Sequence, residues 1–142
     1  MSRFHDYDDC YDQSAQWAQI RFQGALKKTI SGSHGQAFLR ELLTALDAMP
    51  EKQLIESELV TEEGCCALGV VFKSRGLDST GIDPDAHEFV AQRLGITETL
   101  ATQLAYVNDE YGRWRDVSPS QRFDLVREWV VKHIAEEPPD AD

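Results

Sequence analysis

The chain has 142 residues, of which 42% are hydrophobic and 27% charged, and this size and balance predict one globular domain that buries its own core. No apolar run reaches the roughly 18 residues of a membrane-spanning helix, and the first residues lack the basic-then-apolar order of a signal peptide. We therefore expect neither a membrane protein nor a secreted one. The net charge of -11 repels phosphate backbones, which argues against direct binding of nucleic acid.

The three cysteines do not predict a disulfide framework. An odd number cannot all pair within one chain, and two of the three, Cys65 and Cys66, are neighbours that could bridge only with backbone strain. Such a count is typical of a reducing compartment. We therefore expect the protein in the cytosol.

The first residues differ in pattern from those that follow. Residues 1–12 mix acids with aromatics and show no 3.6-residue period, which predicts an N-terminal tail. Ser14 then caps a predicted helix over residues 14–30, and the Ser-Gly-Ser-His-Gly segment at 31–35 ends it. The next predicted helix, over 36–48, has apolar residues at i, i+3 and i+4 spacing and ends before a proline.

The middle of the chain allows two interpretations. Residues 54–60 alternate partly between apolar and acidic side chains, which indicates a short strand. From Cys65 the sequence is apolar at both the 2-residue and the 3.6-residue period. We favour a helix there, because Lys73 and Arg75 suit a helix C-terminus and Gly76 supplies the left-handed position after it. A strand that pairs back on residues 54–60 is the alternative.

Three further helices are predicted from their capping residues. Asp83, followed by a proline, is expected to cap a helix that ends at Gly95. Thr97 is expected to cap the next helix. Ser118, followed by a proline and then by Gln121 at the third helical position, predicts a capping box for the last helix.

Together these elements predict a mainly α fold of about six short helices around one core, with one small β-hairpin or strand near residues 54–60. No internal repeat or linker divides the chain, so residues 13–135 are expected to form a single helical domain. Residues 136–142 are acidic and contain two prolines, which predict a C-terminal tail.

The adjacent cysteines are the first candidates for chemistry. At a helix start the free N–H groups would stabilise a thiolate on Cys65 or Cys66, and a base such as His34 or His87 would be needed as well. The favoured interpretation is core packing, because free cysteines are among the most buried residues and Gly69 indicates a close backbone contact one turn later. No spacing of cysteines and histidines matches a zinc site and no phosphate loop occurs, so we expect no metal and no cofactor.

Acidic residues gather between positions 47 and 63, where Lys52 is the only base. The simpler interpretation of this charge is that it keeps the protein soluble; the alternative is a surface that suits a partner with a basic surface. Our candidate partner-binding residues are acids of this segment and of the end of the fifth helix, together with a tryptophan between two arginines: Glu56, Glu58, Glu62, Glu63, Asp109, Glu110 and Trp114. For Asp109 and its neighbour Asn108 we favour a structural role, in which their side chains bond to free backbone groups at the helix end or to the caps of a neighbouring helix. The alternative is that Asp109 and Glu110 form a carboxylate pair for acid–base chemistry or for binding a cation.

Five short motifs occur in a fixed order along the chain. They are Gly35-Gln36-Ala37-Phe38-Leu39-Arg40-Glu41-Leu42-Leu43, Ala45-Leu46-Asp47-Ala48-Met49-Pro50, Cys66-Ala67-Leu68-Gly69, Val107-Asn108-Asp109-Glu110 and Pro119-Ser120-Gln121-Arg122. Over roughly residues 17–135 this order resembles a family of small, uncharacterised proteins of tailed phages and prophages. The resemblance implies a phage or prophage origin and action in the bacterial host cytosol, and it brings no catalytic residues to this sequence.

Hypotheses from two classes of function follow. The first is a non-enzymatic binding protein that contacts a host protein with a basic surface; the phage resemblance adds inhibition of a nucleic-acid-binding defence complex, in the manner of an anti-CRISPR. The second is a small thiol enzyme that uses Cys65 or Cys66. A self-associating accessory or regulatory protein, which would make the chain a homo-oligomer, is a further alternative.

Overall fold

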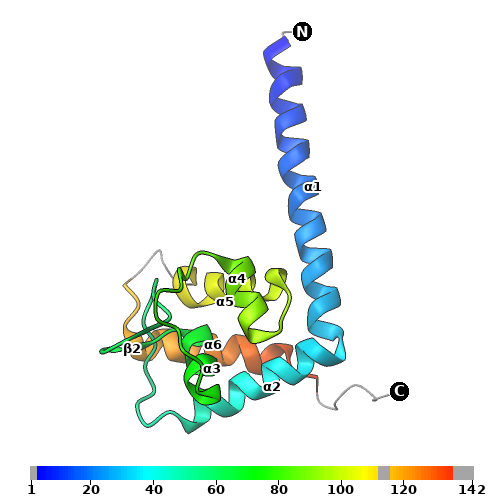
Figure 1. Cartoon of the computed structure of the whole chain (residues 1–142). Helices are drawn as coiled ribbons and strands as arrows, with labels where there is room; N and C mark the ends of the chain where they lie inside the picture. The colour runs from blue at the N-terminus through cyan, green and yellow to red at the C-terminus, as the bar shows by residue number, and fades with distance from the viewer. Residues whose placement is uncertain (1–2, 112–115, 136–142) are drawn as a thin grey trace.

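The computed structural model describes residues 3–111 and 116–135 and is mainly helical, as the sequence predicts. In these residues six helices accompany a two-stranded antiparallel sheet (Figure 1). The elements are α1 (Arg3–Ser31), α2 (Ser33–Ala48), β1 (Val60–Thr61), β2 (Gly64–Cys65), α3 (Ala67–Arg75), α4 (His87–Leu94), α5 (Glu98–Glu110) and α6 (Pro119–His133). No helix of this described part is long and apolar enough to cross a membrane.

Helix α1 is longer than the sequence pattern predicts. It begins at Arg3 rather than at Ser14, so the segment expected to be a tail is helical from its third residue onward. The N-terminal part of α1 stands clear of the other helices (Figure 1). A helix that faces no core needs no apolar stripe, and the missing 3.6-residue period of this segment therefore gave the wrong prediction.

The break between α1 and α2 is shorter than predicted. Gly32 alone separates the two helices; of the predicted break, Ser31 is the last residue of α1, and residues 33–35 belong to α2. Gly35 is packed against α1 so closely that a Cβ atom on it would lie 1.9 Å from the carbonyl oxygen of Thr29. A side chain at this position would push the two helices apart.

The strand predicted over residues 54–60 is wrong for most of its length. Only Val60 and Thr61 form β1, which pairs with Cys65 and Gly64 of β2. The preceding residues form a loop that is held by backbone hydrogen bonds, from Leu54 N–H to the carbonyl of Pro119 (3.1 Å) and from Ile55 N–H to the carbonyl of Cys65 (3.0 Å). The helix predicted from Cys65 onward is confirmed from residue 67 to 75. Its first two predicted residues lie outside α3, since Cys65 belongs to β2 and Cys66 is the N-cap.

Most of the predicted caps are confirmed. The hydroxyl of Thr97 accepts a hydrogen bond from Leu100 N–H (3.1 Å), and Ser118 forms the complete capping box with Gln121. Gly76 and Gly95 both adopt the left-handed conformation, with φ of 69° and 74°, at the ends of α3 and α4.

The cap predicted at Asp83 is wrong. Helix α4 begins at His87, and its N-cap position is Ala86. The carboxylate of Asp83 instead accepts a hydrogen bond from the N–H of Asp85 at 2.9 Å, two residues further along. This Asx-turn competes with helix capping for the same side chain, and here it closes a turn ahead of the helix.

The core lies where α2, α3, α5 and α6 meet. Helix α2 packs against α3 and α6, and α5 packs against α3, α4 and α6, while α1 contacts α2 and α5. The largest side chains with almost no exposed surface come from five segments: Leu39, Leu42, Leu46, Leu54, Leu68, Val71, Phe72, Val90, Leu94, Leu100, Leu104 and Val107. The loop between α2 and β1 is thus tied into the same core through Leu54.

Candidate partner-binding groove

A groove of 640 Å³ opens between the end of α2, the following loop, the β1–β2 hairpin and α3. Its lining includes apolar side chains from three separate segments, and three acids, Glu51, Glu62 and Glu63, lie along it. Lys73 is the only base among the described residues that line it. We call this site the acidic groove and define it by Ala45, Ala48, Met49, Pro50, Glu51, Gln53, Ile55, Thr61, Glu62, Glu63, Gly64, Cys65, Val70, Lys73, Ser74 and Pro119.

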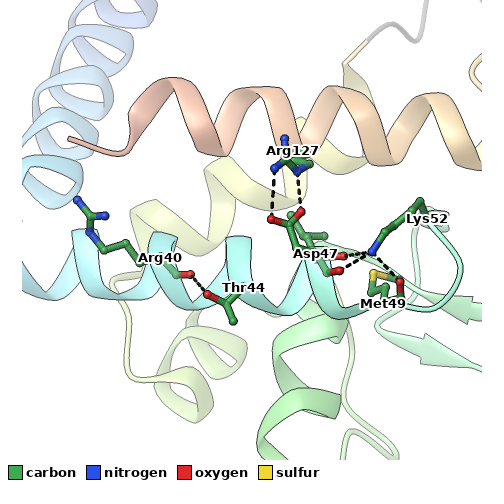
Figure 2. A network of polar contacts seen from close by, with 7 residues as sticks. Arg40, Thr44, Asp47, Met49, Lys52 and Arg127 are labelled. Atoms are coloured by element: carbon green, nitrogen blue, oxygen red, sulfur yellow. Dashed lines mark hydrogen bonds and ion pairs between the residues drawn. The ribbon is translucent and has the colours of Figure 1, made fainter. Parts of the chain in front are cut away.

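The α2 wall of the groove is fixed by Lys52. Figure 2 shows its ammonium group folded back over the end of α2. The Nζ atom donates to the carbonyl oxygens of Asp47 (2.6 Å) and Met49 (2.7 Å), and lies 3.3 Å from that of Leu46. The last carbonyls of a helix have no intrahelical partner and carry partial negative charge, so a cation here is stabilising. The contact holds the turn after α2 in place.

The same end of α2 is joined to α6. The Nε and Nη2 atoms of Arg127 donate to the two carboxylate oxygens of Asp47 at 2.7 and 3.2 Å (Figure 2). The hydrogen bond from Arg127 lowers the pKa of Asp47 from its ordinary value. Asp47 belongs to the acidic segment of the sequence, but its charge is paired within the molecule.

Asn108 fixes the opposite wall. This side chain is 1% exposed, and its Oδ1 atom accepts a hydrogen bond from the N–H of Ala67, the first residue of α3, at 3.0 Å. Its Nδ2 atom donates to the carbonyl of Ile55 (2.9 Å) and to the carboxylate of Asp109 (2.8 Å). Asp109 also accepts from Ser57 N–H at 3.1 Å. The structural interpretation of Asn108 and Asp109 is confirmed, because their side chains join α5 to the start of α3 and to the loop.

The predicted partner-binding residues do not lie in one site. Glu62 and Glu63 lie between the two strands of the hairpin and line the acidic groove. Glu58 and Asp109 line a different, much smaller hollow beside α5. Glu56 forms an ion pair with the largely buried Arg122, with 3.5 Å between Oε2 and Nη2.

The remaining two predicted residues are Glu110 and Trp114, and of these Glu110 does not line the groove. Glu110 is the last residue of α5 and is half-buried. Trp114 lies outside the described residues. The groove residues that sequence reasoning missed are Glu51, Lys73 and the apolar lining. Glu51 could have been found from the acidic segment, whereas Lys73 was assigned only to its helix terminus.

The two neighbouring cysteines are buried, as the core interpretation predicts. They are 2% and 8% exposed, and the sulfur of Cys66 accepts a hydrogen bond from Gly69 N–H at 3.4 Å, in the manner of an N-cap. Burial raises the pKa of Cys66 to about 12. Burial also raises the pKa of Cys65, with a smaller opposing effect from the charge of Lys73. The raised pKa of each cysteine disfavours the thiolate that a nucleophile requires.

The close backbone contact predicted at Gly69 is present. A Cβ atom on this residue would lie 1.9 Å from the carbonyl oxygen of Leu59. The same carbonyl accepts a hydrogen bond from the N–H of Cys66 at 3.0 Å. Within the described residues, no group of three or more histidines, cysteines or acids is arranged to hold a metal ion.

Comparison of the chain with protein-family models, with curated proteins and with solved structures gives no match. The function of the groove has to be inferred from its own geometry and charge.

Proposed function

We propose that this chain is a non-enzymatic binding protein whose acidic groove holds a basic segment of a partner protein. The observation that carries the proposal is the combination of Glu51, Glu62 and Glu63 with an apolar lining in one groove of 640 Å³. That volume lies in the range, roughly 300–1,000 Å³, that is typical of protein binding sites for small ligands. It is large enough to take a few side chains of a bound peptide.

The chemistry of the groove selects its occupant. Three carboxylates beside a single ammonium group favour arginine and lysine side chains, which pair with carboxylates through charge-assisted hydrogen bonds. The apolar surface of Ile55, Met49 and Pro50 favours an apolar residue between these bases. The net charge of -11 steers such a segment toward the protein and raises the association rate.

The groove walls are held in place by hydrogen bonds within the chain. Lys52 ties down the end of α2, Asp47 joins that end to α6, and Asn108 ties the loop and α3 to α5. A site whose walls are already ordered loses less conformational entropy on binding. This preorganisation supports binding as the mode of action, and the two buried thiols argue against the alternative of a thiol enzyme.

The resemblance to phage and prophage proteins gives the proposal its context. We place the partner among host proteins that themselves bind nucleic acid, including defence complexes of the kind that anti-CRISPR proteins inhibit. The basic surface of such a protein is built to attract phosphates, and a row of carboxylates can compete for it. In this role the chain would act in the cytosol of the host and would need no cofactor.

A peptide selection tests the binding chemistry directly. The full chain is used to select ligands from a random peptide library, and the affinity of a selected peptide is then measured by calorimetry. We expect selected peptides with arginine or lysine on either side of an apolar residue. The double variant Glu62→Lys, Glu63→Lys should lose binding at least about 100-fold, because it places cations where the peptide bases sit. Ala48→Trp should also weaken binding, since it fills the groove without a change in charge.

The matched control separates the groove from the overall charge. Glu88→Lys with Glu128→Lys changes the net charge by the same amount at exposed positions on α4 and α6. This control should bind within about threefold of the wild type, because distant surface charges are screened by salt. Equal losses in the two double variants, or selected peptides without basic residues, would contradict the proposal.

The host partner is tested in a bacterial lysate. We expect the wild type and the control variant to capture a nucleic-acid-binding complex, and the Glu62→Lys, Glu63→Lys variant to lose it. Duplex DNA added to the lysate should displace the captured complex, because the acidic groove and the phosphates compete for one basic surface. Capture that DNA leaves unchanged would contradict this choice of partner.

A further inference from the structure

The exposed part of α1 lacks a packing partner within the described body. Among residues 14–31 of α1, whose side chains the structure describes, Leu26 is buried, and Phe22 and Ile30 are packed partly against the core. All side chains from residue 14 to 21 are exposed, and Figure 1 shows the N-terminal part of the helix extending away from the other helices. Helices in proteins draw most of their stability from packing of one face, so this segment offers a face to another molecule.

Two large apolar side chains occupy that face. Trp17 is 59% and Ile20 58% exposed, the highest values among the exposed large hydrophobic residues of the described chain. With about 3.6 residues per turn, Trp17 lies on the side of α1 opposite the buried Leu26, so the described core, which Leu26 faces, does not cover it. Gly24 lies two turns beyond Trp17 on this side, and a Cβ atom on it would meet nothing within 4 Å. The spacing from Trp17 to Ile20 to Gly24 matches the 3–4 pattern of paired helices.

The charge along α1 indicates which helix can pair with it. The sequence of its first part contains four aspartates, Asp6, Asp8, Asp9 and Asp12, and its last part contains the bases Arg21, Lys27 and Lys28. A second α1 placed antiparallel brings acidic turns beside basic turns at both ends of the contact. A parallel α1 would instead bring like charges together, which is destabilising between neighbouring helices.

We propose that two copies of this chain associate through α1, side by side and antiparallel, with Trp17 and Ile20 of both copies covering one another. The symmetry of such a contact is closed, because each copy presents the same face to the other. The acidic groove lies between α2, the hairpin and α3, so its function and this association are separate properties of the molecule. A dimer of this kind would present two acidic grooves to a partner and raise the effective concentration of the second.

The mass of the full chain in solution tests the association. Sedimentation of the wild type over a wide range of concentration should show a reversible dimer. Trp17→Glu with Ile20→Glu should raise the dissociation constant at least about 100-fold, because it removes the apolar contact and places charges in it. Both positions are exposed, so the variant should keep the urea-unfolding transition of the core.

A control of the same chemistry tests the location. Phe89→Glu with Val131→Glu replaces two other exposed apolar residues, 49% and 45% exposed, on α4 and α6. This variant should dimerise like the wild type. A wild type that stays monomeric, or a loss of the dimer in both variants alike, would overturn the proposal.

Charge reversal tests the antiparallel arrangement. Lys27→Glu with Lys28→Glu should weaken the dimer about tenfold or more, because it places acids beside the acidic turns of the second copy. Lys73→Glu with Lys132→Glu makes the same change in net charge on exposed residues of α3 and α6 and should have less than about a threefold effect. Equal effects of the two reversals would overturn the antiparallel arrangement.

Discussion

The side chain of Asn108 and the backbone of Ala67 join the end of α5 to the start of α3 across 41 residues of sequence. The Asn108 Oδ1 atom accepts the Ala67 N–H at 3.0 Å in a buried contact. The first N–H groups of a helix have no intrahelical partner, and those at the start of α3 lie in the interior, where water cannot supply one. Asn108 therefore acts as an internal cap, and it sets the position of α3 relative to the loop that forms the groove.

Asn108→Leu should destabilise the fold strongly. The substitution keeps a similar volume but leaves the Ala67 N–H and the Ile55 carbonyl without their partner, and each unsatisfied buried group costs about 1–3 kcal/mol. We expect a loss of about 2–4 kcal/mol in the free energy of unfolding, measured by urea denaturation. Gln92→Ala, at an exposed site on α4, should stay within about 0.5 kcal/mol of the wild type. A loss below 1 kcal/mol for Asn108→Leu would argue against its role as a cap, on the same scale.

Gly69→Ala should be among the most damaging small substitutions. The added Cβ would lie 1.9 Å from the Leu59 carbonyl, which is backbone and already bonded to Cys66 N–H. Relief requires that α3 and the loop move apart, and overpacking of this kind costs about 3 kcal/mol. Urea denaturation should show this loss, while Ser74→Ala at an exposed site on the same helix changes stability by less than about 0.5 kcal/mol. Similar stabilities for the two alanine variants would rule out a tight contact at Gly69.

The parts of the fold that sequence predicts well are those fixed by neighbouring residues. The caps at Thr97 and Ser118 and the left-handed glycines at Gly76 and Gly95 depend on chemistry within a few residues, and the structure confirms them. The cap predicted at Asp83 is wrong for a reason that is also local: an aspartate side chain can accept a hydrogen bond either from the start of a helix or within an Asx-turn. The sequence does not indicate which of these two hydrogen bonds forms.

The candidate site could be predicted only in part, because it is assembled over long range. Glu62 and Glu63 were identified from charge alone, and the structure places them at the groove. The lining residues Ala45, Ile55 and Val70 come from three segments, and each looks like an ordinary core residue in its own helix or loop. Apolar periodicity cannot separate a groove lining from a core, since both turn inward.

The two neighbouring thiols should resist alkylation in the folded state. Both are buried, and the raised pKa of Cys66, about 12, leaves very little thiolate at neutral pH. We expect iodoacetamide to modify Cys65 and Cys66 only when urea unfolds the chain, with the modified sites located by mass spectrometry of peptides. The unfolded chain serves as the positive control for reagent and detection. Rapid modification of either thiol in the native protein would restore the thiol enzyme as the better hypothesis.

The ion pair between Glu41 and Arg75 should make stability depend on pH in the acid range. Two hydrogen bonds, Nε to Oε2 at 2.7 Å and Nη2 to Oε1 at 2.6 Å, lower the pKa of Glu41 from its ordinary 4.5, and partial burial opposes this. The unfolded chain therefore takes up this proton at a higher pH than the folded one, so the stabilisation is complete above pH 4.5 and is lost as the pH falls below it. Because the two side chains are 35% and 31% exposed, we expect the pair to contribute at most about 1 kcal/mol.

Urea denaturation of Glu41→Gln should show this loss near neutral pH and a smaller difference from the wild type in acid. Glu128→Gln, an exposed acid on α6, should match the wild type within about 0.5 kcal/mol at both pH values; a Glu41→Gln difference that stays constant with pH would show that titration of this carboxyl does not stabilise the fold.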